Sequence, residues 1–212
     1  MPSSFVDARR CLGLRSVARR VNANVRPTSR VAVRRRLGPP LAASYGDGLT
    51  LSGYGRQVPG AYVAISGPSD AAPPDLVDAE TVARWAAEHG HVVVCGGLDG
   101  VMAAAARGAA AAGGTSVGLL PGDTRDGAAP ELTVALATGL GDMRNALLVR
   151  TSDVVVCIGG SWGTLSELAL AVRTGVPVIA LRTWVPAGAP GRLLEVGSAD
   201  EVCDALATYL DR

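Results

Sequence analysis

From residue 61 onward, short apolar runs alternate with segments in which apolar positions recur at helical spacing. This alternation is typical of βαβ units, in which helical crossovers make the strands parallel. Strands are predicted over 61–65, 91–95, 115–120, 132–136, 153–158 and 176–181. Helices are predicted over 75–89, from after 100 to about 113, and over 142–151, 164–173 and from 198 onward. The pattern predicts a Rossmann-like, doubly wound α/β fold with a mostly parallel sheet and helices on both faces.

Composition agrees with that fold. The 212 residues are 48% hydrophobic and only 4% aromatic, so Val, Leu, Ile and Ala must supply most of the buried surface. These residues fill parallel sheets and the helices that cover them. The length suits one sizeable α/β domain, which we place at residues 58–212.

Residues 1–57 differ from the rest of the chain. Residues 1–40 hold ten of the twenty arginines and a single acid, Asp7, which leaves ten arginines against eighteen acids in the remainder. The segment has no sustained apolar period, so we interpret it as an Arg-rich, disordered N-terminal extension. A transit peptide and a nucleic-acid arm remain alternatives to a solvated tail, which we favour. We expect no nucleic-acid partner.

Several classes of site are disfavoured by residue usage. The chain has no lysine, which excludes a P-loop and a pyridoxal-phosphate Schiff base. Its four cysteines form no CxxC pair and its two histidines lie away from any acidic cluster, so we expect no metal and no disulfide framework. No apolar run approaches the ~20 residues that span a bilayer. We therefore expect a reduced, cytoplasmic protein that does not contact membranes.

Glycine-bearing turns follow three of the predicted strands. They contain Ser66 and Gly67 after Ile65, Gly96 and Gly97 after Cys95, and a longer run after Ile158 that includes Gly159, Gly160, Gly163 and Thr164. In a parallel sheet such turns meet at one edge, where helix N-termini offer N–H groups to anions. The turns predict a phosphate-binding edge, although glycine can also serve turn sterics alone. None of them matches GxGxxG, so an NAD fingerprint is not supported.

Two charged residues flank the longest turn and have competing interpretations. The run Thr164 to Glu167 fits a capping box, in which Glu167 would only return a hydrogen bond to the backbone of the N-cap. Arg144 is either a solvated helix residue or a ligand for phosphate or carboxylate. From the residues alone the structural interpretation is favoured for both.

The glycine runs also resemble a known family. Residues 139–145, GLGDMRN, and 159–167, GGSWGTLSE, resemble the signature of the LONELY GUY (LOG) phosphoribohydrolases of the SLOG superfamily. Residues 96–102 resemble the family's second glycine turn. The similarity covers roughly residues 60–185 and is greatest to the branch that includes molybdenum cofactor carrier protein-like members.

The resemblance implies roles for residues of this chain. Arg144 and Glu167 correspond to the catalytic pair, and the glycines with Thr164 to the phosphate cradle. Two positions depart from the signature: Ile158 replaces its Pro, and Asn145 replaces the Lys of cytokinin-activating members. The resemblance also implies a homodimer or higher homo-oligomer. It implies no resident cofactor, but a nucleotide or a molybdopterin-type molecule as bound ligand.

Two functions follow from these expectations. The first is hydrolysis of the N-glycosidic bond of a nucleoside 5′-monophosphate, which releases the base and ribose 5-phosphate. The second is a carrier or sensor that binds a nucleotide or the molybdenum cofactor, a pterin, without turnover. The presence of both Arg144 and Glu167 places the hydrolase first, whereas Asn145 favours binding.

Truncation tests the domain boundary. Because residues 1–57 lack periodic apolar content, a chain that begins at Val58 should keep the same cooperative thermal transition as the full chain. Circular dichroism melts of the two proteins make the comparison. An insoluble truncated protein, or one without a cooperative transition, would show that the extension is part of the fold.

Overall fold

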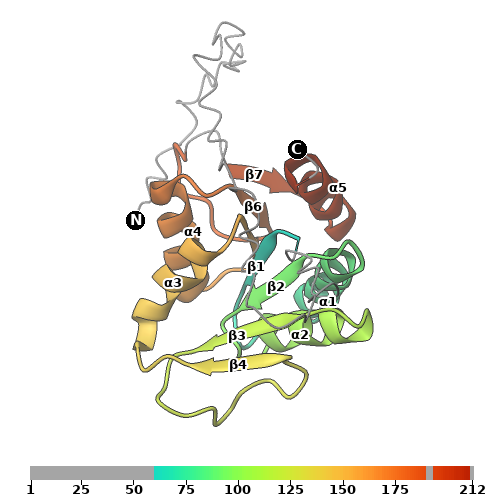
Figure 1. Ribbon diagram of the computed structural model, residues 1–212. Coiled ribbons are helices and arrows are strands. Elements are labelled where there is room, and N and C mark those ends of the chain that lie inside the picture. Colours follow the sequence, from blue (N-terminus) through green and yellow to red (C-terminus); the bar gives the residue numbers. More distant parts are fainter. Residues whose placement is uncertain (1–59, 190–192, 211–212) are drawn as a thin grey trace, which may run out of the picture. The chain divides into compact units, whose positions relative to one another are not determined.

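The computed structural model describes residues 60–189 and 193–210 (Figure 1). These residues form a seven-stranded sheet in the order β4-β3-β2-β1-β5-β6-β7, and every strand pair is parallel. The predicted Rossmann-like α/β fold is therefore confirmed. The predicted extension 1–57 lies outside the described residues.

The elements alternate as the periodicity predicts. The strands are β1 Tyr62–Ser66, β2 Val92–Cys95, β3 Ser116–Leu120, β4 Val134–Ala137, β5 Val154–Ile158, β6 Val178–Leu181 and β7 Leu193–Val196. The helices are α1 Pro73–Glu88, α2 Val101–Ala111, the 3-10 helix η1 Gly141–Met143, α3 Arg144–Thr151, α4 Trp162–Thr174 and α5 Ala199–Leu210.

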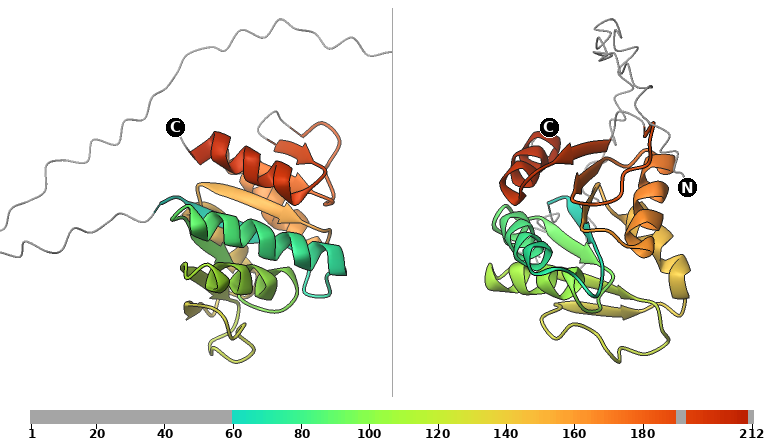
Figure 2. Two further views of the ribbon diagram at one scale, coloured as in Figure 1. Left: turned by 90° about the vertical axis from the view of Figure 1, so that its right-hand side faces the viewer. Right: turned by 180° about the vertical axis from the view of Figure 1, so that it is seen from behind.

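The central strands β1, β2 and β5 are apolar at nearly every position because both faces of the sheet are covered. Along β1, Val63 and Ile65 pack under α1 and α2, whereas Ala64 packs toward the opposite face. Helices α5, α1 and α2 lie side by side across one face, and α3 and α4 cover the other (Figure 2). This two-sided burial is why β5 reads as an unbroken run of Val, Cys and Ile.

Chain direction determines where a ligand can bind. From β1 the chain moves outward through β2 and β3 to β4, then returns through α3 to β5 on the other side of β1. The carboxyl ends of β1 and β5 are therefore neighbours whose connecting helices leave toward opposite faces. Such a switch point opens a crevice at the carboxyl edge of a parallel sheet.

Two features of the chain differ from the sequence-based expectation. Strand β7 was not predicted, because its residues are half-buried or exposed, as in an edge strand, and form no apolar run. Helix α3 begins at Arg144, after the short η1 turn, rather than at Asp142. Arg144 therefore occupies the first turn of α3.

The last helix, α5, begins with a modified capping box. The backbone N–H of Glu201 donates to Oγ of Ser198 at 3.3 Å, as in a capping box. The Glu201 carboxylate accepts from the N–H of Gly197, one residue earlier than a standard box requires.

Among the described helices, none is both long and apolar enough to cross a membrane.

Helices α1 and α2 approach closely through small residues. A Cβ built on Gly108 of α2 would lie 2.1 Å from the carbonyl oxygen of Glu80 in α1 and 3.0 Å from Cβ of Ala83. The backbone of α1 thus occupies the space that a side chain at Gly108 would need. The contact brings the two helices together over β1 and β2.

Gly108→Ala should therefore destabilise the protein, although Ala is the better helix former by about 1 kcal/mol. The clash is with backbone, so the helices must separate, and we expect a net loss of about 1–3 kcal/mol in the free energy of unfolding. Denaturant titration measures the free energy of unfolding of each variant. Gly163→Ala in α4 is the matched control, because its Cβ would meet only Ser161 Oγ at 3.7 Å. Equal stabilisation by both substitutions would contradict the prediction.

Candidate functional site

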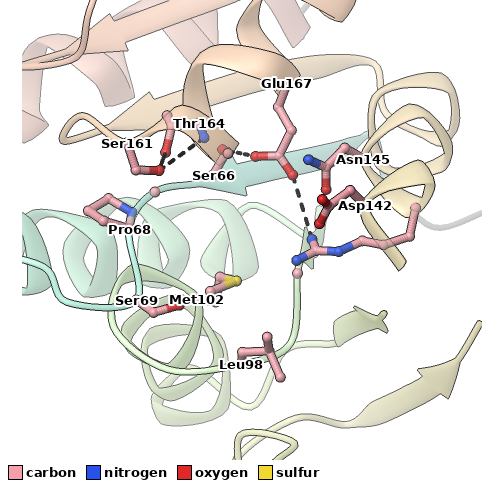
Figure 3. Close-up of a pocket in the computed structure, with 14 residues that line it drawn as sticks. Ser66, Pro68, Ser69, Leu98, Met102, Asp142, Asn145, Ser161, Thr164 and Glu167 are labelled. Carbon is pink, nitrogen blue, oxygen red and sulfur yellow. Dashed lines mark hydrogen bonds and ion pairs between the residues drawn. The ribbon is translucent and has the colours of Figure 1, made fainter. Parts of the chain in front are cut away.

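A cavity of about 140 Å³ lies at the carboxyl edge of the sheet, over the ends of β2, β1 and β5 (Figure 3). Four segments converge on it: the turn after β1, the turn after β2, the start of α3 and the first turns of α4. The lining residues are Ser66, Gly67, Pro68, Ser69, Gly96, Leu98, Met102, Asp142, Arg144, Asn145, Ser161, Gly163, Thr164 and Glu167. The switch point of the sheet is therefore also the site of a polar cavity.

The first turn of α4 is capped by Ser161. Its Oγ accepts from the backbone N–H of Thr164 at 3.1 Å and lies 2.9 Å from the Thr164 hydroxyl oxygen. The helix begins at Trp162, so Thr164 is its third residue and not its N-cap. The capping-box interpretation of Glu167 is therefore wrong, because Glu167 lies in the second turn, beyond reach of the N-cap.

Glu167 is instead a buried group of the cavity wall. It is 6% exposed, and its Oε2 accepts a hydrogen bond from the hydroxyl of Ser66 at the end of β1. Its Oε1 lies 3.6 Å from Nη1 of Arg144. Burial raises the pKa of the Glu167 carboxyl above its ordinary value, and the Ser66 hydrogen bond and the Arg144 charge offset part of that rise.

The Arg144 guanidinium is held between Glu167 and the turn after β2. Its side chain is 12% exposed, and a Cβ on Gly96 would lie 2.2 Å from its Nη1 and 2.5 Å from Sδ of Met102. Gly96 therefore lacks a side chain where the guanidinium lies. Nε of Arg144 is buried and has no hydrogen-bond partner among the described residues.

Other predicted glycines serve packing. Gly67 lines the cavity, but a Cβ there would also meet the carbonyl oxygen of Ile158 at 2.5 Å and the Val101 side chain at 2.6 Å. Gly97 has φ +78° and lies against Gly118 of β3, away from the cavity lining. Gly97 does not line this cavity, and its role in binding stays a prediction.

Gly159 and Gly160 are likewise absent from the lining. Gly159 has φ +69°, and a Cβ there would lie 2.7 Å from Oδ2 of Asp75 in α1. A Cβ on Gly160 would lie 2.7 Å from Nε1 of Trp184, the indole that follows β6. A valine at position 160 would therefore collide with Trp184, so a side chain there would disturb packing as well as any ligand.

Gly163 differs from these glycines. It is exposed and lines the cavity, and among the described residues only Ser161 Oγ, at 3.7 Å, lies near the position of a Cβ. Neither its neighbours nor a left-handed backbone requires glycine there. Gly163 therefore combines a place in the cavity lining with open space at the Cβ position, in the first turn of α4.

The structure adds lining residues that sequence reasoning did not select as site residues. Asn145 is buried, and its Nδ2 donates to Oγ of Ser166 at 2.9 Å, which joins α3 to α4 beside the cavity. Asp142 is an exposed acid at the rim. The run 139–145 contains both, but only the folded positions of α3 and α4 show that they face the cavity.

The comparisons with known proteins agree with this geometry. A family model described as the SLOG cluster4 family matches residues 60–205. The molybdenum cofactor binding protein of Rippkaea orientalis superimposes with a TM-score of 0.68 at 31% identity, covering 71% of this chain and 98% of that chain. The molybdenum cofactor carrier protein of Chlamydomonas reinhardtii gives 0.65 at 30% identity, covering 72% and 99%.

A protein of Archaeoglobus fulgidus, described as uncharacterized, is 41% identical over 101 residues, which is 48% of this chain and 66% of that protein. The match thus spans just under two thirds of that relative's length. The suspected SLOG relationship is confirmed by the family match and by the structural neighbours. Because the family model matches well over half of its residues, the chain belongs to the SLOG cluster4 family.

Proposed function

We propose that this protein binds the anionic end of a phosphorylated pterin- or nucleotide-type ligand in the cavity and carries that ligand without turning it over. The observation that carries the proposal is the convergence of Arg144, the open first turn at Gly163 and the Ser66–Glu167 pair on one cavity.

The anion subsite lies between α4 and Arg144. The N–H groups of Trp162 and Gly163 are in the first turn of α4 and have no intrahelical acceptor. That of Thr164 is already satisfied by Ser161. Arg144 supplies a buried Nε without a partner among the described residues, and a phosphate oxygen suits that donor. The absence of a side chain at Gly163 leaves room for an anion to approach the helix.

Glu167 adds a hydrogen-bond acceptor to the cavity. Among the described residues, its Oε2 accepts a hydrogen bond from Ser66, whereas Oε1 has only a long contact of 3.6 Å with Arg144. Oε1 can therefore accept a hydrogen bond from a hydroxyl or N–H group of the ligand. The volume of about 140 Å³ is below the roughly 300–1,000 Å³ of pockets that enclose a whole drug-sized ligand. The cavity thus holds one end of such a ligand.

The structural neighbours support a carrier. The solved structures described above are of proteins named for binding or carrying the molybdenum cofactor, and this chain covers 98% and 99% of their lengths. Here the cofactor, a phosphorylated pterin, would be cargo. Asn145 is consistent with this proposal, because it adds no positive charge for a nucleotide base and its amide is tied to Ser166.

A second candidate is the phosphoribohydrolase, favoured by the pairing of Arg144 with Glu167. Water would replace the base at C1 of the ribose, giving the free base and ribose 5-phosphate. The Glu167 carboxylate would stabilise the oxocarbenium-like transition state or orient the water, while Arg144 holds the phosphorylated sugar.

Substitution of Glu167 and Arg144 separates carrier from hydrolase. For a carrier, no nucleoside monophosphate yields free base by chromatography, Glu167→Gln changes ligand affinity little, and Arg144→Ala weakens binding by about 1.5–3 kcal/mol. For a hydrolase, Glu167→Gln lowers the rate on the order of a hundredfold or more with similar affinity. Turnover by the wild-type protein that is lost in Glu167→Gln would overturn the carrier proposal.

Anion affinity should also depend on pH through Glu167. Two acids, Glu167 and Asp142, line the cavity with one cation, Arg144. The pKa of Glu167 is raised, so protonation removes its repulsion of a bound anion, and anion binding in turn favours the proton. Affinity should therefore be highest below the raised pKa and should fall as the pH rises through it. Sulfate, which stays fully ionised, is the probe for calorimetric titration.

In Glu167→Gln the sulfate affinity should lose this dependence, because Gln does not titrate. A wild-type affinity that stays constant over the whole pH range in which the protein is folded would show that Glu167 does not face the bound anion.

Gly163→Val tests the place of the anion. Because the Cβ would enter open space, we expect an unchanged melting temperature together with a loss of sulfate and ribose 5-phosphate binding of at least about tenfold, since the side chain blocks the first turn of α4. Thermal shift and calorimetry measure the two effects. The matched control is Ala169→Val, which places the same side chain on the exposed side of the same helix, away from the cavity lining. Unchanged affinity in a folded Gly163→Val protein would place the anion elsewhere.

A further inference from the structure

Two of the chain's three tryptophans are exposed and in contact. Trp162 exposes 79% of its surface and Trp184 exposes 46%. Their ring centroids are 5.3 Å apart and the rings are inclined by 72° in an edge-to-face arrangement. Tryptophan usually buries most of its ring, and here that surface lies outside the core. This indole pair needs an explanation other than folding.

The indole pair adjoins the cavity through the turn after β5. Trp162 stands in the chain between Ser161 and Gly163, which both line the cavity. Trp184 follows β6, and its indole lies against Gly160, where a Cβ would be 2.7 Å from Nε1. Gly160 has no left-handed φ, so its lack of a side chain serves this contact. Ser161 and Gly163 therefore border the cavity, while Gly160 of the same turn contacts the indole pair.

The cavity itself offers no stacking surface. None of its lining residues is aromatic, and its volume of about 140 Å³ accommodates only part of a nucleotide-sized ligand. A fused ring carried by the ligand would have to be recognised outside. The indole pair is the exposed aromatic surface that adjoins the cavity within the described residues.

We propose that the indole pair of Trp162 and Trp184 is a subsite for the planar fused ring, purine or pterin, of the same ligand whose anionic end enters the cavity. This inference rests on the proposed function. The ligand crosses the turn after β5 at the switch point of the sheet, with its anion at Gly163 and Arg144 and its ring against an indole. Stacking requires only a π-face, so it suits either ring system.

Paired titrations of the full chain test the subsite. Guanosine 5′-monophosphate carries the ring and ribose 5-phosphate lacks it. The wild-type protein should bind the nucleotide more tightly, with quenching of tryptophan fluorescence. Trp162→Ala should weaken nucleotide binding by about 5- to 100-fold and reduce the quenching, with ribose 5-phosphate affinity unchanged. If the wild-type protein hydrolyses the nucleotide, the titrations use the Glu167→Gln background.

The controls cover folding and alternative roles. Trp184→Phe keeps a ring against Gly160 and should retain most of the affinity. Leu136→Ala removes another exposed apolar side chain, on the outer strand β4 and outside the cavity lining, and should change nothing. Circular dichroism melts verify that each variant folds. Nucleotide affinity no higher than that of ribose 5-phosphate, or equal in Trp162→Ala and wild type, overturns the inference and leaves the proposed function intact.

Two further outcomes have separate meanings. If neither ribose 5-phosphate nor sulfate binds the wild-type protein, the proposed function itself fails. The resemblance implies a homo-oligomer, so sedimentation is measured on the same variants. A Trp162→Ala protein that dissociates while its nucleotide affinity stays unchanged assigns the indole pair to contact with a second copy, and overturns the ring subsite.

Discussion

The buried carboxylate of Glu167 is the constraint around which the cavity is built. A carboxylate withdrawn from water must be hydrogen-bonded or paired, or its burial costs several kcal/mol. Ser66 at the end of β1 and Arg144 at the start of α3 meet that requirement from two directions. Because Ser66 and Glu167 are 101 residues apart, the contact ties together strands and helices on both sides of the switch point. The same three side chains form the polar wall that a ligand meets.

Glycine has two distinct uses at this edge of the sheet. Gly67, Gly97 and Gly159 let protein atoms approach one another, and side chains there would collide with backbone or with neighbouring side chains. Gly96 makes room for the Arg144 guanidinium, so its effect on a ligand is indirect. Gly163 alone among the predicted site glycines borders open space. The first three glycines allow strands and helices to pack closely. Gly163 leaves space through which an anion can approach the first turn of α4.

The site is divided between charge and aromatic surface. Polar groups line a small cavity, while the Trp162–Trp184 pair contacts the turn after β5 at Gly160. A ligand that is anionic at one end and planar at the other would match both parts. Such a division binds a molecule by its two ends and leaves its middle accessible, which suits a carrier that must hand over its ligand.

The sequence alone determined the α/β fold, the parallel sheet and the edge at which the turns meet, because burial on both faces imposes apolar runs and helical crossovers impose parallel strands. It also indicated Ser66, Gly96, Arg144, Gly163 and Glu167, which the fold does bring to one cavity. Strand β7 escaped prediction because an edge strand carries a mixed pattern.

Only the tertiary structure decided which partners these residues have. The local run Thr164 to Glu167 fits a capping box, yet Ser161 caps the helix and Glu167 pairs with Ser66 and Arg144. Likewise, no local pattern reveals that Trp184 lies against Gly160 or that its indole meets Trp162. Periodicity indicates which face of an element is buried, and glycine indicates where the backbone needs conformational freedom or space. Contacts between distant segments follow instead from the strand order, which a short stretch of sequence does not contain.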